Sequence, residues 1–198
     1  MRMTKKDIPT TIMDAAETLF LKHGFRRVSV NEICRGAGVS RKTFYVYFAN
    51  KDALTIKLLD KLVDTLTDEF VEVMNSDVPF SDKMASMMEM KLALSRQLSM
   101  DFMADLFTAS SDEVLHHYRE KADSNLSLAR SLFLQAHEQG EIRRELDIDM
   151  VMAMFNYQTD LCSKPEFRAH FKDVESMTQQ MMEMMLFGIV GNSDMDKK

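Results

Sequence analysis

The stretch SVNEICRGAGVSRKTFYVYF, residues 29–48, decides the fold of this 198-residue chain. Ser29 precedes Glu32 by three positions, which is the capping-box pattern that satisfies free amide donors at the start of a helix. Gly38 can adopt the left-handed conformation that ends this short helix, and Ser40 can cap the next one. Two short helices joined by a few residues around a glycine predict a helix-turn-helix.

The packing of such a motif sets conditions that the neighbouring residues meet. The two helices cross closely, so a small residue is needed four positions before the turn glycine, and Cys34 stands there. Ile33, Val39 and Phe44 are the apolar positions expected to pack against a preceding helix. We interpret Cys34 as a small, buried and inert thiol; the alternative is a redox-sensitive thiol whose pKa is lowered by the neighbouring Arg35.

The second helix of the motif combines basic and aromatic side chains. A recognition helix presents its N-terminal residues to base edges in the major groove, while its ends and neighbours hold phosphates. Arg41 can bond bidentately to guanine, and Lys51 begins a further helix, where free amides also favour an anion. The alternative is that the aromatic residues only fill the core and the cations are merely solvated. The candidate DNA contacts are Arg41, Lys42, Thr43, Tyr45, Tyr47 and Lys51.

Charge is distributed unevenly along the chain. The formal net charge is −6, yet residues 1–58 carry 11 Lys and Arg against 5 Asp and Glu, a net of +6. The rest of the chain holds the other 14 basic and 26 acidic residues, a net of −12. This asymmetry indicates a polyanion-binding region attached to a region that avoids polyanions, unless it is simple scatter of surface charge.

Helical periodicity continues through nearly the whole chain, which predicts an all-α fold. Leucines at steps of four from Leu54 mark a long helix from Lys51 to about Met74. Such a helix can convert a rearrangement further along the chain into displacement of the helix-turn-helix. Other helices are expected at about 7–22, 81–109, 111–121, 123–139, 148–162 and 174–189.

Residues 12–54 resemble the N-terminal DNA-binding domain of the TetR family of transcriptional regulators. The resemblance is carried by AAETLF, HGF, SVNEI, AGVS, TFYVYF and NKDAL. Lys42, Val28 and Cys34 depart from the glycine, threonine and alanine that the family often has there, and the DNA contact at Lys42 is the one most affected. The resemblance assigns DNA contacts to Ser40, Arg41, Lys42, Thr43, Tyr45, Tyr47 and Lys51.

The same resemblance implies an organisation and a function. A helix-turn-helix DNA-binding domain is expected at 1–50, a helical ligand-binding and dimerisation domain at 51–190, and a disordered tail at 191–198. The implied protein is a repressor that binds a semi-palindromic operator in double-stranded DNA as a homodimer. A small apolar or amphipathic effector would release it, and no cofactor is expected. The alternative is a helical module that binds a protein partner, with operator binding constitutive or lost.

Two apolar stripes near the C-terminus predict self-association. Paired across a twofold axis, the last two predicted helices would form a four-helix interface; the alternative is that both stripes pack inside one subunit. One stripe is Val151, Met154, Phe155, Gln158, Leu161 and Cys162, and the other is Val174, Met177, Met181, Met184, Met185 and Gly188.

Methionine is frequent, with 19 residues in the chain. Flexible thioethers can line an adaptable pocket for apolar ligands, although they also fill gaps in ordinary cores. The candidate ligand-binding residues are Met88, Met103, Phe107, Tyr118, Phe155 and Tyr157.

Several classes of protein are disfavoured. The sequence has no nucleophile elbow, phosphate-cradling glycine loop or HExxH motif, so we expect no enzyme and no catalytic residues. Cys34 and Cys162 lie far apart and without metal-ligand spacing, so we expect neither a disulfide nor a metal site. No apolar run approaches the roughly 18 residues of a membrane span, and no secretory signal is recognisable. We therefore expect a cytoplasmic protein with no membrane partner.

Overall fold

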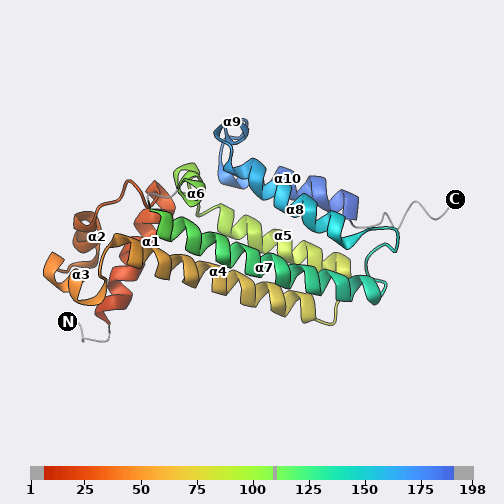
Figure 1. Ribbon diagram of the computed structural model, residues 1–198, viewed down its shortest axis with the longest axis horizontal. Helices are drawn as coiled ribbons and strands as arrows, with labels where there is room; N and C mark the ends of the chain where they lie inside the picture. Colours follow the sequence, from red (N-terminus) through yellow and green to blue (C-terminus); the bar gives the residue numbers. More distant parts are fainter. Residues whose placement is uncertain (1–6, 109–110, 190–198) are drawn as a thin grey trace. The chain divides into compact units, whose positions relative to one another are not determined.

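The computed structural model describes residues 7–108 and 111–189, except for the side chains of residues 185–189. The regular structure in these residues is entirely α-helical, which confirms the predicted fold class, and Figure 1 labels the helices in chain order. Contacts between residues divide the chain into two compact units. Unit 1 comprises Met1–Asp64 and Gln97–Glu120, and unit 2 comprises Thr65–Arg96 and Lys121–Lys198.

The helix-turn-helix forms as predicted. The Glu32 amide donates to the Ser29 hydroxyl at 3.3 Å, and the Ser29 amide donates to the Glu32 carboxylate at 2.8 Å, which completes the capping box. Gly38 is left-handed, with φ of 65°, and Ser40 caps the next helix by accepting from the Thr43 amide at 3.0 Å. The three helices of this region are α1 (Ile8–His23), α2 (Val30–Ala37) and α3 (Arg41–Tyr47).

The core of unit 1 contains the apolar positions that the motif requires. Ile33 and Phe44 are fully buried, and Val39 packs against them half-buried. Cys34 is buried too, and desolvation raises the pKa of its thiol, with the charge of Arg41 acting weakly in the opposite direction. The direction of this shift favours the inert thiol over one whose pKa Arg35 lowers.

Two predicted boundaries in the middle of the chain are wrong. The stretch expected as one helix over 81–109 is two helices, because Ser99 starts a new one by accepting from the Phe102 amide at 3.1 Å. The two helices expected over 111–121 and 123–139 are a single helix. Its polar residues do not break it, since the Ser127 hydroxyl donates back along the helix to the Asp123 carbonyl at 3.0 Å. These helices are α4 (Lys51–Asn75), α5 (Phe80–Ser95), α6 (Met100–Phe107) and α7 (Asp112–Glu138).

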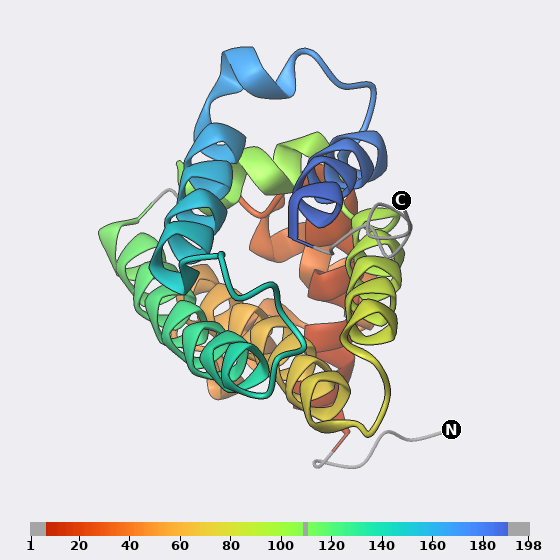
Figure 2. The same cartoon turned by 90° about the vertical axis from the view of Figure 1, so that its right-hand side faces the viewer.

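Aromatic rings and methionines build the core of unit 2. The Phe133 ring meets Phe80 edge to face at 5.9 Å and Phe155 at 5.7 Å. Met84 and Met87 of α5 are buried in the same cluster, and α10 packs along α5 (Figure 2). The C-terminal helices are α8 (Ile148–Ser163), α9 (Pro165–Arg168) and α10 (Val174–Ile189).

The compact units do not coincide with the predicted functional domains. Unit 1 holds the start of α4 and all of α6 as well as α1, α2 and α3. The division at residues 50 and 51 is a statement about function and stays a prediction, and the tail at 191–198 lies outside the described residues. Within those residues, no helix combines the length and the apolar character that crossing a membrane requires.

Candidate DNA-binding site

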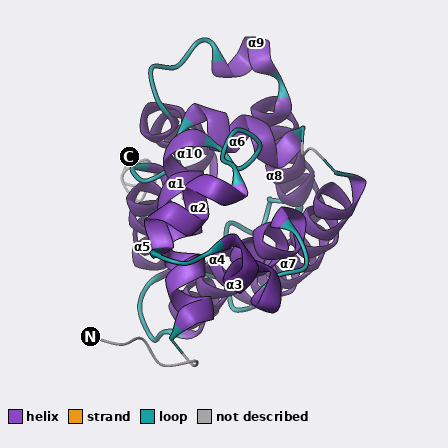
Figure 3. Cartoon of the chain, turned by 90° about the vertical axis from the view of Figure 1, so that its left-hand side faces the viewer, coloured by secondary structure: helices purple, strands orange, loops and turns teal. Residues whose placement is uncertain are grey.

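Helix α3 presents its first turn at the surface of unit 1 (Figure 3). Arg41 and Lys42 are both exposed there. The Arg41 guanidinium lies 5.9 Å from the centre of the Tyr45 ring, and a hydrogen bond to the Tyr45 hydroxyl raises the pKa of Arg41. Tyr45 stands one turn later on the same helix, so these two interactions orient the guanidinium along α3 before any base is present.

The hydroxyl-bearing candidates divide into two groups. The Ser40 and Thr43 hydroxyls are 2.9 Å apart and hydrogen-bonded to each other at the start of α3, beside the two cations. One hydroxyl of such a pair keeps its proton for another acceptor, such as a phosphate oxygen. Tyr47, by contrast, is half-buried and packs against the core of unit 1. The structure thus brings together Ser40, Arg41, Lys42, Thr43 and Tyr45, and turns the ring of Tyr47 inward.

Lys51 is used differently from the prediction. Its ammonium donates to three backbone carbonyls in the segment before α2: Phe25 at 2.8 Å, Arg26 at 3.1 Å and Val28 at 3.0 Å. An ammonium has three protons to donate, and this arrangement uses all of them. Partial burial lowers the pKa of Lys51, with desolvation as the main cause. A phosphate contact by this side chain does not fit the geometry; Lys51 instead ties the loop before α2 to the start of α4.

An exposed residue of α3 was missed by the sequence analysis. Val46 is 71% exposed, although it lies between Tyr45 and Tyr47 on a helix whose Phe44 is fully buried. An apolar side chain at this place can contact the methyl group of thymine in the major groove. The signal was available, because Val46 follows Lys42 by one helical turn and therefore shares its outward side.

Comparison with known proteins agrees with this geometry. The family model for bacterial regulatory proteins of the tetR family matches residues 12–58. The transcriptional regulator TtgR of Pseudomonas putida is 28% identical, over 93% of this chain and 96% of that protein. Residues 12–58 are thus a DNA-binding region of the TetR family, and the chain as a whole is similar to transcriptional regulators of this type.

Solved structures show the same fold over nearly the whole chain. The fatty acid degradation regulator FadR from Bacillus halodurans is 22% identical with a TM-score of 0.70, and the likeness covers 95% of this chain and 98% of that one. FadR from Bacillus subtilis, solved in complex with stearoyl-CoA, is 19% identical with a TM-score of 0.64, over 91% and 98% of the two chains. The proteins named here are transcriptional regulators and not enzymes.

The two apolar stripes predicted to pair between subunits are each buried in part within unit 2, and each has an exposed methionine, Met154 on α8 and Met184 on α10. Val151, Val174 and Met177 are at most 3% exposed, because they pack into the core of their own subunit. Met185 and Gly188 belong to the residues whose side chains are not described. Met154 belongs with two further exposed residues of α8 to a set that we call the α8 stripe, which is 49–62% exposed, and Met184 of α10 is exposed as well. The α8 stripe consists of Met150, Met154 and Tyr157.

The predicted ligand-binding residues divide between the two units. The rings of Phe107 and Tyr118 meet at 6.3 Å and pack, with Met103, against the core of unit 1. Met88 and Phe155 belong to unit 2, and Tyr157 is exposed in the α8 stripe. Spacing along single helices could not separate these groups, since it does not tell which helices are neighbours.

Proposed function

We propose that this protein is a TetR-family, ligand-responsive repressor of the cytoplasm. It binds a semi-palindromic operator as a homodimer, and a small apolar or amphipathic molecule bound in unit 2 releases it. The observation that carries the proposal is the exposed first turn of α3. There the Arg41 guanidinium is oriented by Tyr45 on a helix whose other side is fixed in the core by Phe44.

On DNA, each exposed group of α3 has a distinct role. Arg41 reads a base edge, and guanine is the base that a guanidinium matches with two parallel hydrogen bonds. Val46 contacts a thymine methyl group, which makes it a second reader of sequence. Lys51 acts indirectly, by fixing the loop before α2. The phosphate contacts come from Ser40, Lys42, Thr43 and Tyr45, with Tyr47 at the edge of the contact surface.

The α8 stripe supports dimerisation. Met150, Met154 and Tyr157 leave apolar surface uncovered along one side of a helix, with Met184 of α10 exposed in the same unit. A twofold axis through such a surface gives an isologous interface, in which each stripe covers its own copy. The dimer then presents two α3 helices to successive major grooves, roughly 34 Å apart.

Helix α6 is the element that supports release by a ligand. Within unit 1, the Arg26 amide donates to the Asp105 carboxylate at 2.8 Å, and the Phe25 ring meets Phe102 at 5.9 Å. The loop runs so close to α6 that a Cβ at Gly24 would lie 3.2 Å from the Asp101 carbonyl oxygen. Only residues 96–99 separate α6 from α5. A ligand that shifts α5 therefore moves α6 and the loop before α2, and favours a dimer whose α3 helices no longer match the operator.

The test is selection of bound sequences from a random duplex library with the purified protein at two salt concentrations. We expect an inverted repeat whose half-sites lie about 10 base pairs apart, centre to centre. The Arg41→Ala variant, selected in parallel, should return a repeat that is degenerate at one position in each half-site. Bulk binding that is sensitive to salt and enriches no sequence would contradict operator recognition. That result would favour a helical module for a protein partner.

A further inference from the structure

Lys91 is a charged residue at a position of α5 where the helical spacing places apolar residues. Phe80, Met84 and Met87 are buried at helical steps of four and three, and Lys91 follows Met87 by four residues. Residues with this spacing lie on one side of a helix, and here that side faces the core of unit 2. The Lys91 side chain therefore leaves α5 in the direction of the core.

The Lys91 ammonium lies among residues of unit 2 without an acidic partner among the described side chains. Its Nζ lies 6.0 Å from the centre of the Phe155 ring on α8, and the Cys162 thiol is its titratable neighbour. Desolvation by the surrounding protein lowers the pKa of Lys91, although the residue itself is exposed. Because the side chain is exposed, a small molecule can reach its ammonium from solvent.

Lys83, two helical turns earlier on α5, shows how unit 2 treats a structural lysine. Lys83 is buried, and its Nζ lies 3.2 Å from the Glu141 carboxylate. Desolvated charges in proteins are normally retained with such a partner, because desolvation of an unpaired charge is costly. Lys91 stands on the same helix without a carboxylate of this kind.

Gln158 of α8 provides a second unpartnered donor. Its Nε2 is buried, and it has no hydrogen-bond partner among the residues that the structure describes. Gln158 follows Phe155 by three residues and precedes Cys162 by four, so it lies on the side of α8 that faces the Lys91 ammonium. A buried amide without a partner is rare in native proteins and calls for an explanation such as a missing ligand.

Two hollows in unit 1 do not offer an equivalent site. One, between α1, α4 and α6, has a volume of about 10 Å³, which is the space of one water molecule. The other, of about 640 Å³, is an open depression between α1 and residues 97–99, and its walls carry Asp14, Glu17 and Lys22. Neither hollow is lined by a buried polar atom that lacks a partner among the described residues.

Both unpartnered groups of unit 2 are donors, and one is a cation, so the group that completes them must be an acceptor with negative charge. We propose that the effector is an amphipathic anion, such as a carboxylic acid with an apolar tail, whose acid group binds between Lys91 Nζ and Gln158 Nε2. The tail lies against Phe155 and the buried methionines of unit 2. This inference rests on the proposed function, because it names the class of the molecule that releases the operator.

Calorimetric titration of the full-length protein tests the site with hexanoate, decanoate and 3-phenylpropionate as acids and decan-1-ol as the uncharged counterpart of decanoate. We expect at least one acid to bind, and decanoate to bind more tightly than decan-1-ol. Lys91→Met should weaken binding of the acid by about tenfold to a hundredfold and should leave the affinity for decan-1-ol unchanged. Gln158→Leu should weaken acid binding by up to about tenfold. Lys172→Met, which removes an exposed lysine of the same unit, is the matched control and should change neither.

Other outcomes overturn the site or the function separately. Failure of all three acids to bind at about 1 mM, or equal affinity of Lys91→Met and the unmodified protein for them, would overturn the anion site. A melting temperature of Lys91→Met at or above that of the unmodified protein confirms that the variant is folded.

Operator release is measured in the same samples. If decan-1-ol releases DNA as well as the acids do, the ligand-responsive repressor stands and the anion site is wrong. If acids bind through Lys91 and the operator stays bound at saturation, the site stands and release by the ligand is wrong.

Discussion

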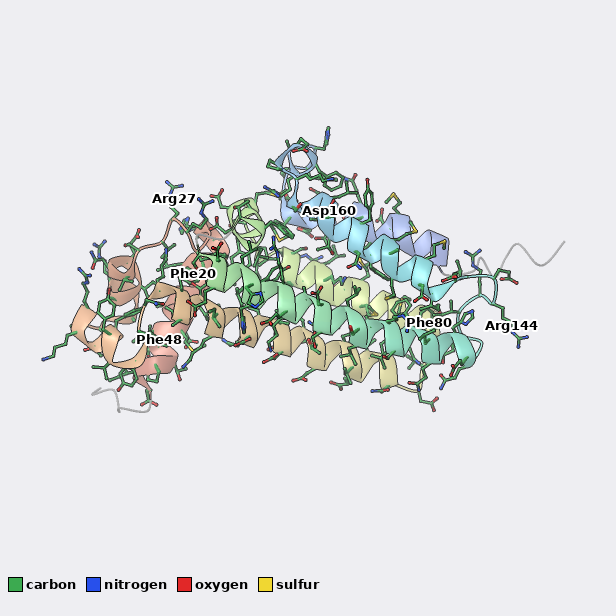
Figure 4. The ribbon with its side chains drawn as sticks, viewed as in Figure 1. Phe20, Arg27, Phe48, Phe80, Arg144 and Asp160 are labelled. Carbon is green, nitrogen blue, oxygen red and sulfur yellow. The ribbon has the colours of Figure 1, made fainter. Side chains whose placement is uncertain are left out.

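The two units differ in how they surround a lysine that lies beside their core. In unit 1 the Lys51 ammonium meets three carbonyls, whereas in unit 2 neither Lys91 nor the Gln158 amide has such a partner among the described residues. The units are otherwise alike in their apolar interiors, which contain Phe20 and Phe80 respectively (Figure 4). Unit 1 therefore holds its DNA-binding helices in one geometry, whereas unit 2 keeps hydrogen-bond donors available for a ligand that binds reversibly.

Replacing each lysine by methionine should have opposite effects on the stability of the two units. Lys51→Met leaves three carbonyls of the loop before α2 without their donor, and we expect it to lower the free energy of unfolding by about 3 kcal/mol. Lys91→Met removes an unpaired cation from an apolar setting, so we expect an unchanged or slightly higher free energy of unfolding. Urea unfolding followed by circular dichroism measures both.

Either half of that experiment can fail on its own. A Lys51→Met protein of normal stability that binds DNA with a salt slope lower by about one would restore the phosphate contact predicted from the sequence. A Lys91→Met protein as unstable as Lys51→Met would mean that Lys91 has a partner within the chain, and the contrast between the units would disappear.

A second prediction concerns the groups of unit 1 that are left open for DNA. Arg41→Ala should reduce the free energy of discrimination between bases by about 1–3 kcal/mol at one base pair of each half-site, because a bidentate contact to a base is lost. Lys42, the neighbour of Arg41, lies on the same turn. Lys42→Ala should weaken binding to specific and to random DNA equally, and should lower the slope of log affinity against log salt concentration by about one. Fluorescence anisotropy with operator and scrambled duplexes separates the two. If Arg41→Ala loses affinity equally for both duplexes, Arg41 does not read a base.

The smallest effect is expected at the capping box of α2. Ser29→Ala removes the oxygen that accepts from the Glu32 amide, and we expect a loss of about 1 kcal/mol in the free energy of unfolding. Thermal unfolding at neutral pH measures the loss. Ser127→Ala is the control, because its hydroxyl bonds within α7 and caps no helix end.

The capping box also predicts a pH dependence. The Ser29 hydroxyl and amide donate to the Glu32 carboxylate, and these bonds lower the pKa of Glu32 in the folded protein. A carboxyl whose folded pKa is lowered stabilises the fold above its unfolded pKa of about 4.3, and this contribution is lost as the pH falls through the folded value. The stability difference between the unmodified protein and Glu32→Gln should thus be largest near pH 7 and should shrink in acid. A difference that is constant with pH would show that the charge of Glu32 plays no part.

Local signals explain why so much of the helix-turn-helix could be predicted. Ser29, Glu32, Gly38 and Ser40 act on amides within four residues of themselves, so their roles can be read from spacing alone. The role of Lys51 could not be predicted in this way, because its partners lie 23–26 residues away in a loop. A lysine at the start of a helix is equally compatible with a phosphate and with a carbonyl cluster until the neighbouring loop is known.

The stripes predicted in the C-terminal half are exposed only in part, and the reason is related. Several helices there have apolar residues on more than one side, so the sequence does not say which side meets the core. Val151 and Val174 turned out to be internal, while Met150 and Tyr157 are exposed. The sequence does contain one local signal for the site in unit 2, because Lys91 is a charged residue in the apolar stripe of α5.

The docking of α6 limits how freely the DNA-binding helices can be exchanged between regulators. Residues 1–50 include Phe25 and Arg26 but not Phe102 and Asp105, which their ring and amide contact. A chimaera cut at the predicted boundary would therefore carry an open hydrophobic edge and an amide without its acceptor. Recombination that keeps α6 with α1, α2 and α3 preserves these contacts. The unit that can be exchanged between regulators therefore consists of two separate segments of the chain.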